Sequence, residues 1–483
     1  MKRMLCLLLA LLTMIPLLIA CSDGEKPSLP TGDTTAAITG GDTDPAETRD
    51  PYDHGVEQID YKEWDFVIVA PQPKGAAYFD REEMTQETVN DAIYTRNRLL
   101  EEYFNITIRA ENMGWTSDMS AHFKSYLMSG EDKVGMAAVG FTQGAKPMIT
   151  DGVALPWNEV PSIDLSEVWW NESVTKTMAV MGNYYYLSGD INWTSMQFTT
   201  GWFFNKDVAK NNKLPDLYQA VRDGKWTWDM ASNLMKGMTR DNGDGTWNEQ
   251  DSYGHVQYVH SLEGWLYGAD YQTVYFQEDG AKMNFFTEKM NNIVNHLYNM
   301  IHVQRISYMT DDAGAMSSIF FDNRALFLTA TLEFAEGWRS YETDFGILPN
   351  PKYDEKQKEY RTVSDQWGLV CCIPSTTTNF KRTGDIVEVM ACLSHQLVRS
   401  AYYDKTLIGK GIRDDESEEM LDIIYKGILY DSGQCYMTNL EWLPLRATVA
   451  VGNSDLTSWW RANQSQISKN YEELYDYVKL QME

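Results

Sequence analysis

Apolar and polar positions follow two different periods along the N-terminal part of the chain. Short apolar runs of the kind that form buried strands occur at 65–70, 106–109 and 134–139. Between these runs, residues 88–104 and 119–128 carry apolar side chains at helical spacing. Strands that alternate with helices are typical of βαβ units, so this region predicts an α/β fold with a largely parallel sheet.

The C-terminal part is predicted to be rich in helices, at 386–398, 416–429 and 465–480. Earlier in the chain, Thr227 is placed to cap a helix, because its hydroxyl can accept a free N–H of the first turn. The sequence has no internal repeat, and it lacks the period of about 34 residues that marks tetratricopeptide arrays. More than four hundred residues follow position 60, which exceeds one typical core and predicts two domains.

Residues 1–21 form a basic start followed by a short apolar run. A helical membrane span needs about 20 apolar residues, so this shorter run predicts a cleaved signal peptide. Ala20 directly before Cys21 resembles a bacterial lipobox. That resemblance implies cleavage before Cys21, attachment of lipid such as palmitate, and an anchor on the outer face of a bacterial cell membrane. An ordinary signal peptide with an incidental cysteine is the alternative.

Residues 22–60 differ in composition from the rest of the chain. They are rich in Asp, Gly, Thr, Pro and Glu and contain almost no large apolar side chain. Such a stretch buries too little surface to offset its ordering entropy, which predicts a flexible acidic tether. The formal net charge of −28 argues against binding to nucleic acid or to an anionic membrane surface.

Aromatic residues make up 13% of the chain, and 16 of them are tryptophan. An indole ring stacks on the C–H face of a sugar while neighbouring polar groups bind its hydroxyls, so this composition favours a carbohydrate ligand. Core packing is the alternative at each single position. Two of the six cysteines lie in the signal segment, and spacing cannot pair the other four, which contain no CxxC motif: Cys371, Cys372, Cys392 and Cys435.

Four ordered segments carry a family resemblance: 184–206, 224–254, 320–352 and 401–422. In order and spacing they resemble the family 1 extracellular solute-binding lipoproteins of ABC importers, which include maltose- and oligosaccharide-binding proteins. The resemblance implies a type II, periplasmic-binding-protein-like α/β fold with two discontinuous lobes joined by hinge strands. It also implies capture of a small solute, most readily a sugar, and its delivery to ABC permease subunits by a monomeric protein that is not an enzyme.

The same resemblance implies chain crossings near 195–201, 310 and 364–367. Lobe one would then comprise residues 61–195 plus 310–365, and lobe two residues 196–309 plus 366–483. Ligand contacts in such a binder come from strand ends that face the cleft and from the hinge. Tryptophan–carboxylate neighbours suit a neutral polyol, and they guide the choice of candidate ligand-binding residues: Phe141, Gln143, Asp190, Trp193, Glu263, Trp265, Glu333 and Trp367.

The acidic stretch after residue 240 has two interpretations. Alternating oxygen ligands around a glycine are typical of a calcium loop of the EF-hand type. With Gly245 at the glycine position, Arg240 falls on the first ligand position and cannot coordinate calcium. An acidic turn is therefore the alternative, and no cofactor is required. The candidate structural calcium ligands are Asn242, Asp244, Thr246, Asn248 and Asp251.

Enzyme motifs are missing from the sequence. It contains no HExxH, no GxSxG and no phosphate-binding GxxxxGK[ST]. A glycoside hydrolase needs only two opposed carboxylates, which 69 acidic residues readily supply, so hydrolysis stays an alternative. A surface glycan-binding lipoprotein of the helical-repeat type is the other alternative, and the missing repeat together with the early strands counts against it.

Overall fold

The computed structural model describes most of the chain after residue 53. No helix in this described part combines the length and the apolar composition of a membrane span. The predicted signal peptide, Cys21 and most of the predicted tether lie outside the described residues. The described ranges are 54–71, 74–114, 119–127, 132–142, 145–365, 367–403, 414–439 and 442–483.

The first lobe is built on a five-stranded sheet among the described residues, with strand order β2-β1-β3-β12-β4. β1 is an apolar run that lies between β2 and β3 and is parallel to both. β12 is antiparallel to β3 and comes from much later in the chain. The strands are β1 (Trp64–Pro71), β2 (Ile106–Met113), β3 (Val134–Gly140), β4 (Ala154–Leu155) and β12 (Leu369–Pro374).

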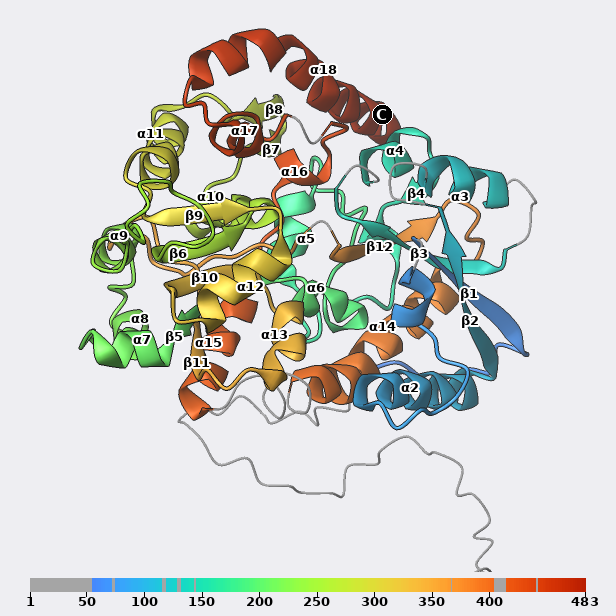
Figure 1. Ribbon diagram of the computed structural model, residues 1–483. Helices are drawn as coiled ribbons and strands as arrows, with labels where there is room; N and C mark the ends of the chain where they lie inside the picture. The colour runs from blue at the N-terminus through green and yellow to red at the C-terminus, as the bar shows by residue number, and fades with distance from the viewer. Residues whose placement is uncertain are drawn as a thin grey trace, which may run out of the picture.

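The second lobe holds another five-stranded sheet of described residues, with order β11-β5-β10-β6-β9. β6 is parallel to β9 and β10, whereas β5, which enters from the first lobe, is antiparallel to β10. Each sheet therefore combines a set of parallel strands with an antiparallel strand, β12 in the first lobe and β5 in the second, which the chain enters directly after it crosses from the other lobe (Figure 1). The strands are β5 (Thr200–Asn205), β6 (Tyr253–Tyr258), β9 (Ser307–Thr310), β10 (Ala325–Thr331) and β11 (Phe345–Leu348).

Helices cover both sheets, and the structure confirms the predicted α/β, two-lobe fold. The predicted helix over 88–104 is α2, and Thr227 caps α9 by accepting the backbone N–H of Met230 at 3.4 Å. The three predicted C-terminal helices are also present. The longer helices are α2 (Thr88–Phe104), α3 (Met119–Leu127), α9 (Trp228–Lys236), α11 (Glu288–Tyr298), α12 (Ala313–Phe321), α14 (Phe380–Leu393), α15 (Asp415–Lys426) and α18 (Leu456–Met482).

Short helical turns connect these elements, and a ribbon of β7 (Val274–Gln277) and β8 (Gly280–Met283) extends the second lobe. The short α-helices are α4 (Ala145–Thr150), α5 (Glu172–Met178), α6 (Thr194–Gln197), α7 (Lys206–Asn211), α8 (Leu217–Arg222), α10 (Glu263–Gly268), α13 (Glu333–Gly337), α16 (Ser432–Cys435) and α17 (Pro444–Ala447). The other turns are η1 (Gly75–Tyr78), η2 (Trp157–Glu159), η3 (Asp190–Asn192), η4 (Val259–Ser261), η5 (Asn299–Val303), η6 (Trp338–Ser340), η7 (Ser394–Arg399) and η10 (Val449–Val451).

The expected lobe boundaries after residue 309 need correction. The range 310–365 was assigned to lobe one, yet β10 and β11 pair within the second sheet. The range 366–483 was assigned to lobe two, yet β12 pairs with β3, and α14 packs against α2 of the first lobe. No crossing occurs at residue 310, because β9 and β10 belong to one sheet. An apolar strand pattern marks burial but does not say which distant strand it joins.

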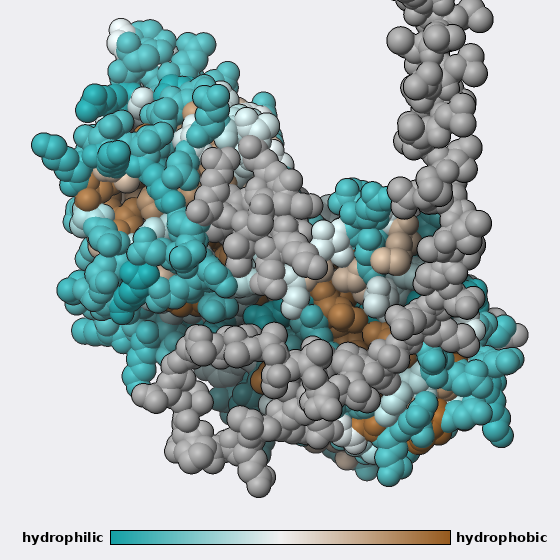
Figure 2. Space-filling view, turned by 90° about the horizontal axis from the view of Figure 1, so that it is seen from below, coloured by the Kyte–Doolittle hydropathy of each residue, from teal (hydrophilic) through white to brown (hydrophobic). Residues whose placement is uncertain are grey.

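Two crossing segments, 193–200 and 361–368, lie side by side between the lobes. Their pairing is antiparallel, with Thr199 opposite Ser364, and the Thr200 backbone N–H donates to the Val363 carbonyl at 3.1 Å. The Leu332 N–H, just after β10, donates to the Thr199 carbonyl at 2.9 Å. The expected crossings near 195–201 and 364–367 are therefore present. Seen from below, a hollow with apolar side chains at its floor separates the lobes (Figure 2).

Candidate ligand-binding cleft

The carboxyl ends of the parallel strands decide where a ligand can bind. In open α/β sheets, ligand sites form from the loops that leave these ends. In the first lobe, these loops are 74–79 after β1 and 141–142 after β3. In the second lobe, they are 259–263 after β6 and 332–336 after β10. The crossing segments run between the two sets, and Figure 1 shows α6 and α13 in this central region.

Aromatic rings form one wall of the cleft beside the first crossing segment. Tyr78 of η1 meets Trp193 edge to face, with ring centroids 5.5 Å apart. Trp193 also contacts Tyr402 at a centroid distance of 5.1 Å, and its Nε1 donates to the Tyr78 carbonyl at 3.3 Å. Trp193 is buried, whereas Tyr78 is only half-buried. Tyr78 therefore offers the accessible aromatic surface, and Trp193 supports it.

Carboxylates of the second lobe face this wall. Glu333 and Glu336 lie in α13, and Thr331 donates its hydroxyl to Glu333 Oε1 at 3.4 Å. Burial, followed by the negative charge of Asp365, raises the pKa of Glu333 to about 7. Burial and the charges of both glutamates likewise raise the pKa of Tyr78 to about 12. Poorly solvated carboxylates beside an aromatic ring are good acceptors for ligand hydroxyl groups.

The second crossing segment places Trp367 at the cleft edge. Its side chain is 42% exposed, and its backbone N–H donates to Asp365 Oδ1 at 3.4 Å. The N–H of Phe141, at the end of β3, donates to the Gly368 carbonyl at 3.3 Å, which ties this loop to the crossing segment. The Phe141 ring itself is buried against Tyr430, with centroids 4.7 Å apart. Phe141 therefore supports the cleft through packing.

Three polar side chains, Glu263, Arg446 and His260, lie together at the carboxyl end of β6 and form a polar group. Arg446 of α17 forms an ion pair with Glu263, with Nε and Oε1 3.1 Å apart. Burial, followed by the charge of Arg446, lowers the pKa of His260. Among the described residues, no hydrogen-bond partner reaches the buried Glu263 Oε2 or His260 Nδ1. Polar atoms of this kind need a partner, which a ligand hydroxyl or water can supply.

A cavity of about 640 Å³ adjoins this polar group through Arg446. Two indole rings and several amides share its lining, a mixture that suits sugar rings and their hydroxyls. The Nε1 of Trp459, which is 8% exposed, has no hydrogen-bond partner within the described residues. The lining residues are Asn439, Trp442, Arg446, Ala447, Val451, Trp459, Asn463 and Gln466.

The structure brings Phe141, Trp193, Glu333 and Trp367 to the crossing region and leaves other candidates elsewhere. Asp190 accepts a hydrogen bond from His395 Nδ1 at 2.5 Å, and Arg399 Nε lies 3.9 Å from it. These three side chains line a different cavity, of about 420 Å³. Gln143 lies outside the described residues.

Trp265 does not reach the cleft surface. Its side chain is 1% exposed, and its ring meets Trp202 and Trp228 edge to face, at centroid distances of 4.9 Å and 5.4 Å. Its Nε1 donates to Gln257 Oε1 at 3.1 Å, so its polar atom is already bonded. The core-packing interpretation therefore holds at this position. Glu263, the first residue of the same short helix, is also buried, and it meets the cleft region through its ion pair with Arg446.

The acidic loop after residue 240 is held by its own side chains. Asp251, which is 1% exposed, accepts the backbone N–H groups of Asn242 and Asn248, both at 2.8 Å. Asp244 accepts the N–H of Thr246 at 2.7 Å. No cluster of three or more His, Cys, Asp or Glu side chains in the described part of the chain is arranged to hold a metal ion. Calcium binding by this loop stays a prediction.

Sequence reasoning missed Tyr78, His260, Glu336, Trp442 and Arg446. Tyr78 and His260 follow predicted or observed strands closely, so their position after a strand end was a usable signal. Arg446 and Trp442 lie far along the chain, and nothing local connects them with β6. The four cysteines after the signal segment are all buried as free thiols. Burial raises the pKa of Cys371 to about 12, as expected for an unreactive core thiol.

Comparison with known proteins agrees with this architecture. No model of a protein family matches the sequence, and no curated protein matches it significantly. Among solved structures, the galacto-N-biose-/lacto-N-biose I-binding protein of a Bifidobacterium longum ABC transporter has a TM-score of 0.57 at 14% identity, covering 85% of this chain and 98% of that chain. The cyclic alpha-maltosyl-1,6-maltose binding protein from Arthrobacter globiformis has a TM-score of 0.57 at 11% identity, covering 86% and 100%.

The GacH receptor of Streptomyces glaucescens, solved unliganded and with acarbose, has a TM-score of 0.53 at 11% identity. It covers 85% of this chain and 100% of its own. Identities at this level carry information about the fold alone. They show that this chain has the two-lobe, periplasmic-binding-protein-like fold of such solute-binding proteins.

Proposed function

We propose that this protein captures an oligosaccharide between its lobes and delivers it to the permease of an ABC importer. The observation that carries the proposal is the arrangement at the crossing segments: the Tyr78 ring of the first lobe packs on Trp193, and Glu336 of the second lobe accepts a hydrogen bond from Gln197 Nε2 at 3.2 Å. The charges of Glu333 and Glu336 reach Tyr78 and help to raise its pKa. An aromatic ring near poorly solvated carboxylates suits a sugar, whose C–H face can stack on the aromatic ring while its hydroxyl groups donate hydrogen bonds to the carboxylates. The solved relatives with similar folds are named as binders of lacto-N-biose, cyclic maltosyl-maltose and acarbose, which favours this ligand class.

Capture requires no bond to be broken. An open form with both lobes solvated is in equilibrium with a closed form, and a ligand that contacts both lobes stabilises the closed form. The paired crossing segments act as the hinge, because they are the backbone that joins the two sheets. The closed form then presents a different surface to a permease, and a separate ATPase supplies the energy. The protein itself acts as a receptor and not as an enzyme.

The proposed location is the outer face of a bacterial cell membrane. It rests on the lipobox-like Ala20-Cys21 pair and on the acidic stretch that follows it.

The test is a thermal-shift screen of the chain from Ser22 to Glu483 against maltotriose, lacto-N-biose, acarbose and a set of tripeptides. A ligand at about 100 times its Kd adds about 2.7 kcal/mol to the folded state, which raises the unfolding midpoint measurably. We expect a raised midpoint with at least one oligosaccharide and no hydrolysis of it by chromatography. A shift with peptides alone would overturn the carbohydrate assignment, and turnover of the glycan would overturn the receptor assignment.

A matched pair of tryptophan variants makes this test specific. Trp367→Ala removes a partly exposed ring at the cleft edge. Trp460→Ala removes a half-buried ring of α18 that stacks on Phe286, at a centroid distance of 6.4 Å. We expect the first variant to lower oligosaccharide affinity and the second to leave it unchanged.

A further inference from the structure

A second pocket lies along the outer edge of the second sheet, on the edge strand β9. It follows β9 from Ser307 to Met309 and reaches Tyr253, the first residue of the neighbouring strand β6. The cleft loops leave the other end of β6, roughly 17 Å from Tyr253 at 3.3 Å per residue. The pocket has a volume of about 510 Å³ and is lined by Gly245, Thr246, Trp247, Tyr253, Ile301, His302, Arg305, Ser307, Tyr308 and Met309.

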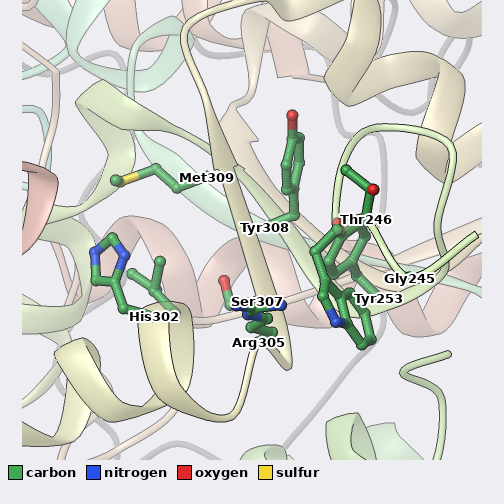
Figure 3. Close-up of a pocket in the computed structure, with 10 residues that line it drawn as sticks. Gly245, Thr246, Tyr253, His302, Arg305, Ser307, Tyr308 and Met309 are labelled. Atoms are coloured by element: carbon green, nitrogen blue, oxygen red, sulfur yellow. The ribbon is translucent and has the colours of Figure 1, made fainter. Parts of the chain in front are cut away.

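Three aromatic rings form the body of this pocket. Tyr253 and Tyr308 are stacked, with centroids 4.8 Å apart, and Trp247 lies 5.9 Å from Tyr253. The guanidinium of Arg305 lies over the Trp247 ring, 5.7 Å from its centroid. In Figure 3, Tyr308 lies between Thr246 on one side and Met309 and His302 on the other. Tyr253 is buried, whereas Trp247 and Tyr308 are only half-buried and keep accessible surface.

The acidic loop holds Thr246 and Trp247 in place. Asp251 bonds to backbone N–H groups at both ends of the loop, and Arg324 donates to the Asp251 carbonyl at 3.1 Å. The buried ring of Tyr253 donates its hydroxyl to the Asn248 carbonyl at 2.7 Å. This wall of the pocket is therefore pre-organised, which lowers the entropy that a ligand must overcome on binding.

Charge selects a neutral ligand. Burial and the negative charges of Glu249, Asp312 and Asp311 raise the pKa of Tyr308, so an anion entering here meets repulsion. Arg305, already positioned on Trp247, disfavours a cation. The remaining polar groups are hydroxyl groups, the Arg305 guanidinium and the imidazole of His302, whose Nε2 lies 2.7 Å from the Val449 carbonyl, and such groups bind alcohols well. A pyranose ring meets these conditions, since its C–H face stacks on aromatic rings and its hydroxyls pair with polar neighbours.

We propose that this pocket is a second carbohydrate site, which holds one or two neutral sugar rings of a polysaccharide outside the transport cleft. Its volume lies within the range of about 300–1,000 Å³ that is typical of small-molecule sites. The pocket lies on one lobe only, so its occupation does not require the lobes to close. It would keep the receptor near a polymer whose fragments enter the cleft, and it stands on observations separate from those of the cleft.

The test is native electrophoresis of the chain from Ser22 to Glu483 in gels that contain amylopectin, galactomannan, arabinoxylan or mixed-linkage β-glucan. We expect at least one polymer to reduce the mobility about twofold relative to albumin. Trp247→Ala and Arg305→Gln should each abolish this retardation, and Trp460→Ala should retain it. Unchanged mobility in all four gels, or retardation that survives both pocket variants, would overturn the proposal.

Two controls separate this site from the cleft and from misfolding. Trp367→Ala should still be retarded by the polymer but show a smaller thermal shift with small oligosaccharides. Trp247→Ala should lose the retardation and keep the full thermal shift. If the thermal-shift results fail, the second site can still hold, and if the retardation results fail, the proposed cleft function can still hold. Arg305 is exposed, so Arg305→Gln should unfold within about 2 °C of the unchanged chain, and it tests the pocket apart from any loss of stability in Trp247→Ala, which removes a half-buried ring.

Discussion

Tyr78 and Trp193 meet edge to face across 5.5 Å, and they come from segments more than a hundred residues apart. Tyr78 follows the first strand of the first lobe, whereas Trp193 opens the first crossing segment. Their contact brings the strand-end loop of one lobe onto the hinge, where Glu333 of the other lobe faces it. The two residues therefore mark the place where the proposed hinge and the proposed ligand contacts lie together.

Removal of the Tyr78 ring should weaken ligand binding without unfolding the protein. The ring is half-buried, so Tyr78→Ala should cost at most about 2 kcal/mol of folding free energy and lower oligosaccharide affinity tenfold or more. Isothermal titration with the glycan from the thermal-shift screen measures the affinity. Tyr78→Phe keeps the ring and serves as the control. Equal affinity in Tyr78→Ala and the unchanged chain would remove this residue from the site.

Glu333 should make the protein less stable as pH rises from about 4.5 to 7. Its folded-state pKa of about 7 exceeds the ordinary value of 4.5, because burial and Asp365 disfavour the charged form. The folded state then holds a proton that the unfolded state releases, so stability falls across this window. Glu333→Gln does not bury a charged carboxylate. Its free energy of unfolding should therefore exceed that of the unchanged chain by on the order of 2 kcal/mol at pH 8, and by little at pH 4.

Urea unfolding of both proteins at pH 4, 6 and 8 measures this difference. Glu472→Gln, an exposed change in α18, controls for the loss of one negative charge. A free-energy difference between Glu333→Gln and the unchanged chain that is constant across the three pH values would contradict the shifted pKa.

Two tryptophan truncations should separate core from cleft. Trp265→Ala opens a cavity beside Trp202 and Trp228, so it should cost about 3–5 kcal/mol of folding free energy. Trp367→Ala should cost less than about 1 kcal/mol, because the ring is 42% exposed. Denaturant unfolding measures both values. The opposite order would show that Trp367 packs the hinge and that Trp265 has accessible surface.

Calcium binding by the loop over 242–251 predicts a raised unfolding midpoint in 1 mM calcium relative to excess chelator. Asp244→Asn should reduce this rise, because it removes one negative charge but keeps a side-chain oxygen that can accept the Thr246 N–H, while Asp251 still holds both ends of the loop. Magnesium at the same concentration is the control for nonspecific ionic effects. Equal midpoints in calcium and chelator would leave the loop as an acidic turn.

Lipid attachment at Cys21 predicts that the expressed full-length protein fractionates with bacterial membranes. Cys21→Ser should release it, because the only proposed anchor is lost while the described fold is untouched. Mass spectrometry of the N-terminal peptide identifies the lipid directly. Cleavage before residue 21 together with an unmodified cysteine would contradict the lipoprotein assignment.

Local sequence determined the elements of this protein and some of its chemistry. Apolar runs at 65–70 and 134–139 became buried strands, and helical spacing over 88–104 became α2, because each pattern reflects burial of one face. The ordered segments of the middle region indicated the two-lobe fold. Trp193, Glu333 and Trp367 were predicted as ligand contacts because they flank predicted crossings or strand ends, and the structure places them at the crossing region.

Only the tertiary structure decided which strands share a sheet and which polar groups meet. β12 returns to the first lobe because it pairs with β3, more than two hundred residues earlier, and its own sequence carries no mark of that partner. In the sequence, Trp265 and Trp367 look alike, because each lies near a carboxylate residue. Only the tertiary structure shows that Trp265 is in the core and that Trp367 is at the surface. Arg446 reached Glu263 across 183 positions, a contact that depends on packing of α17 and not on local pattern.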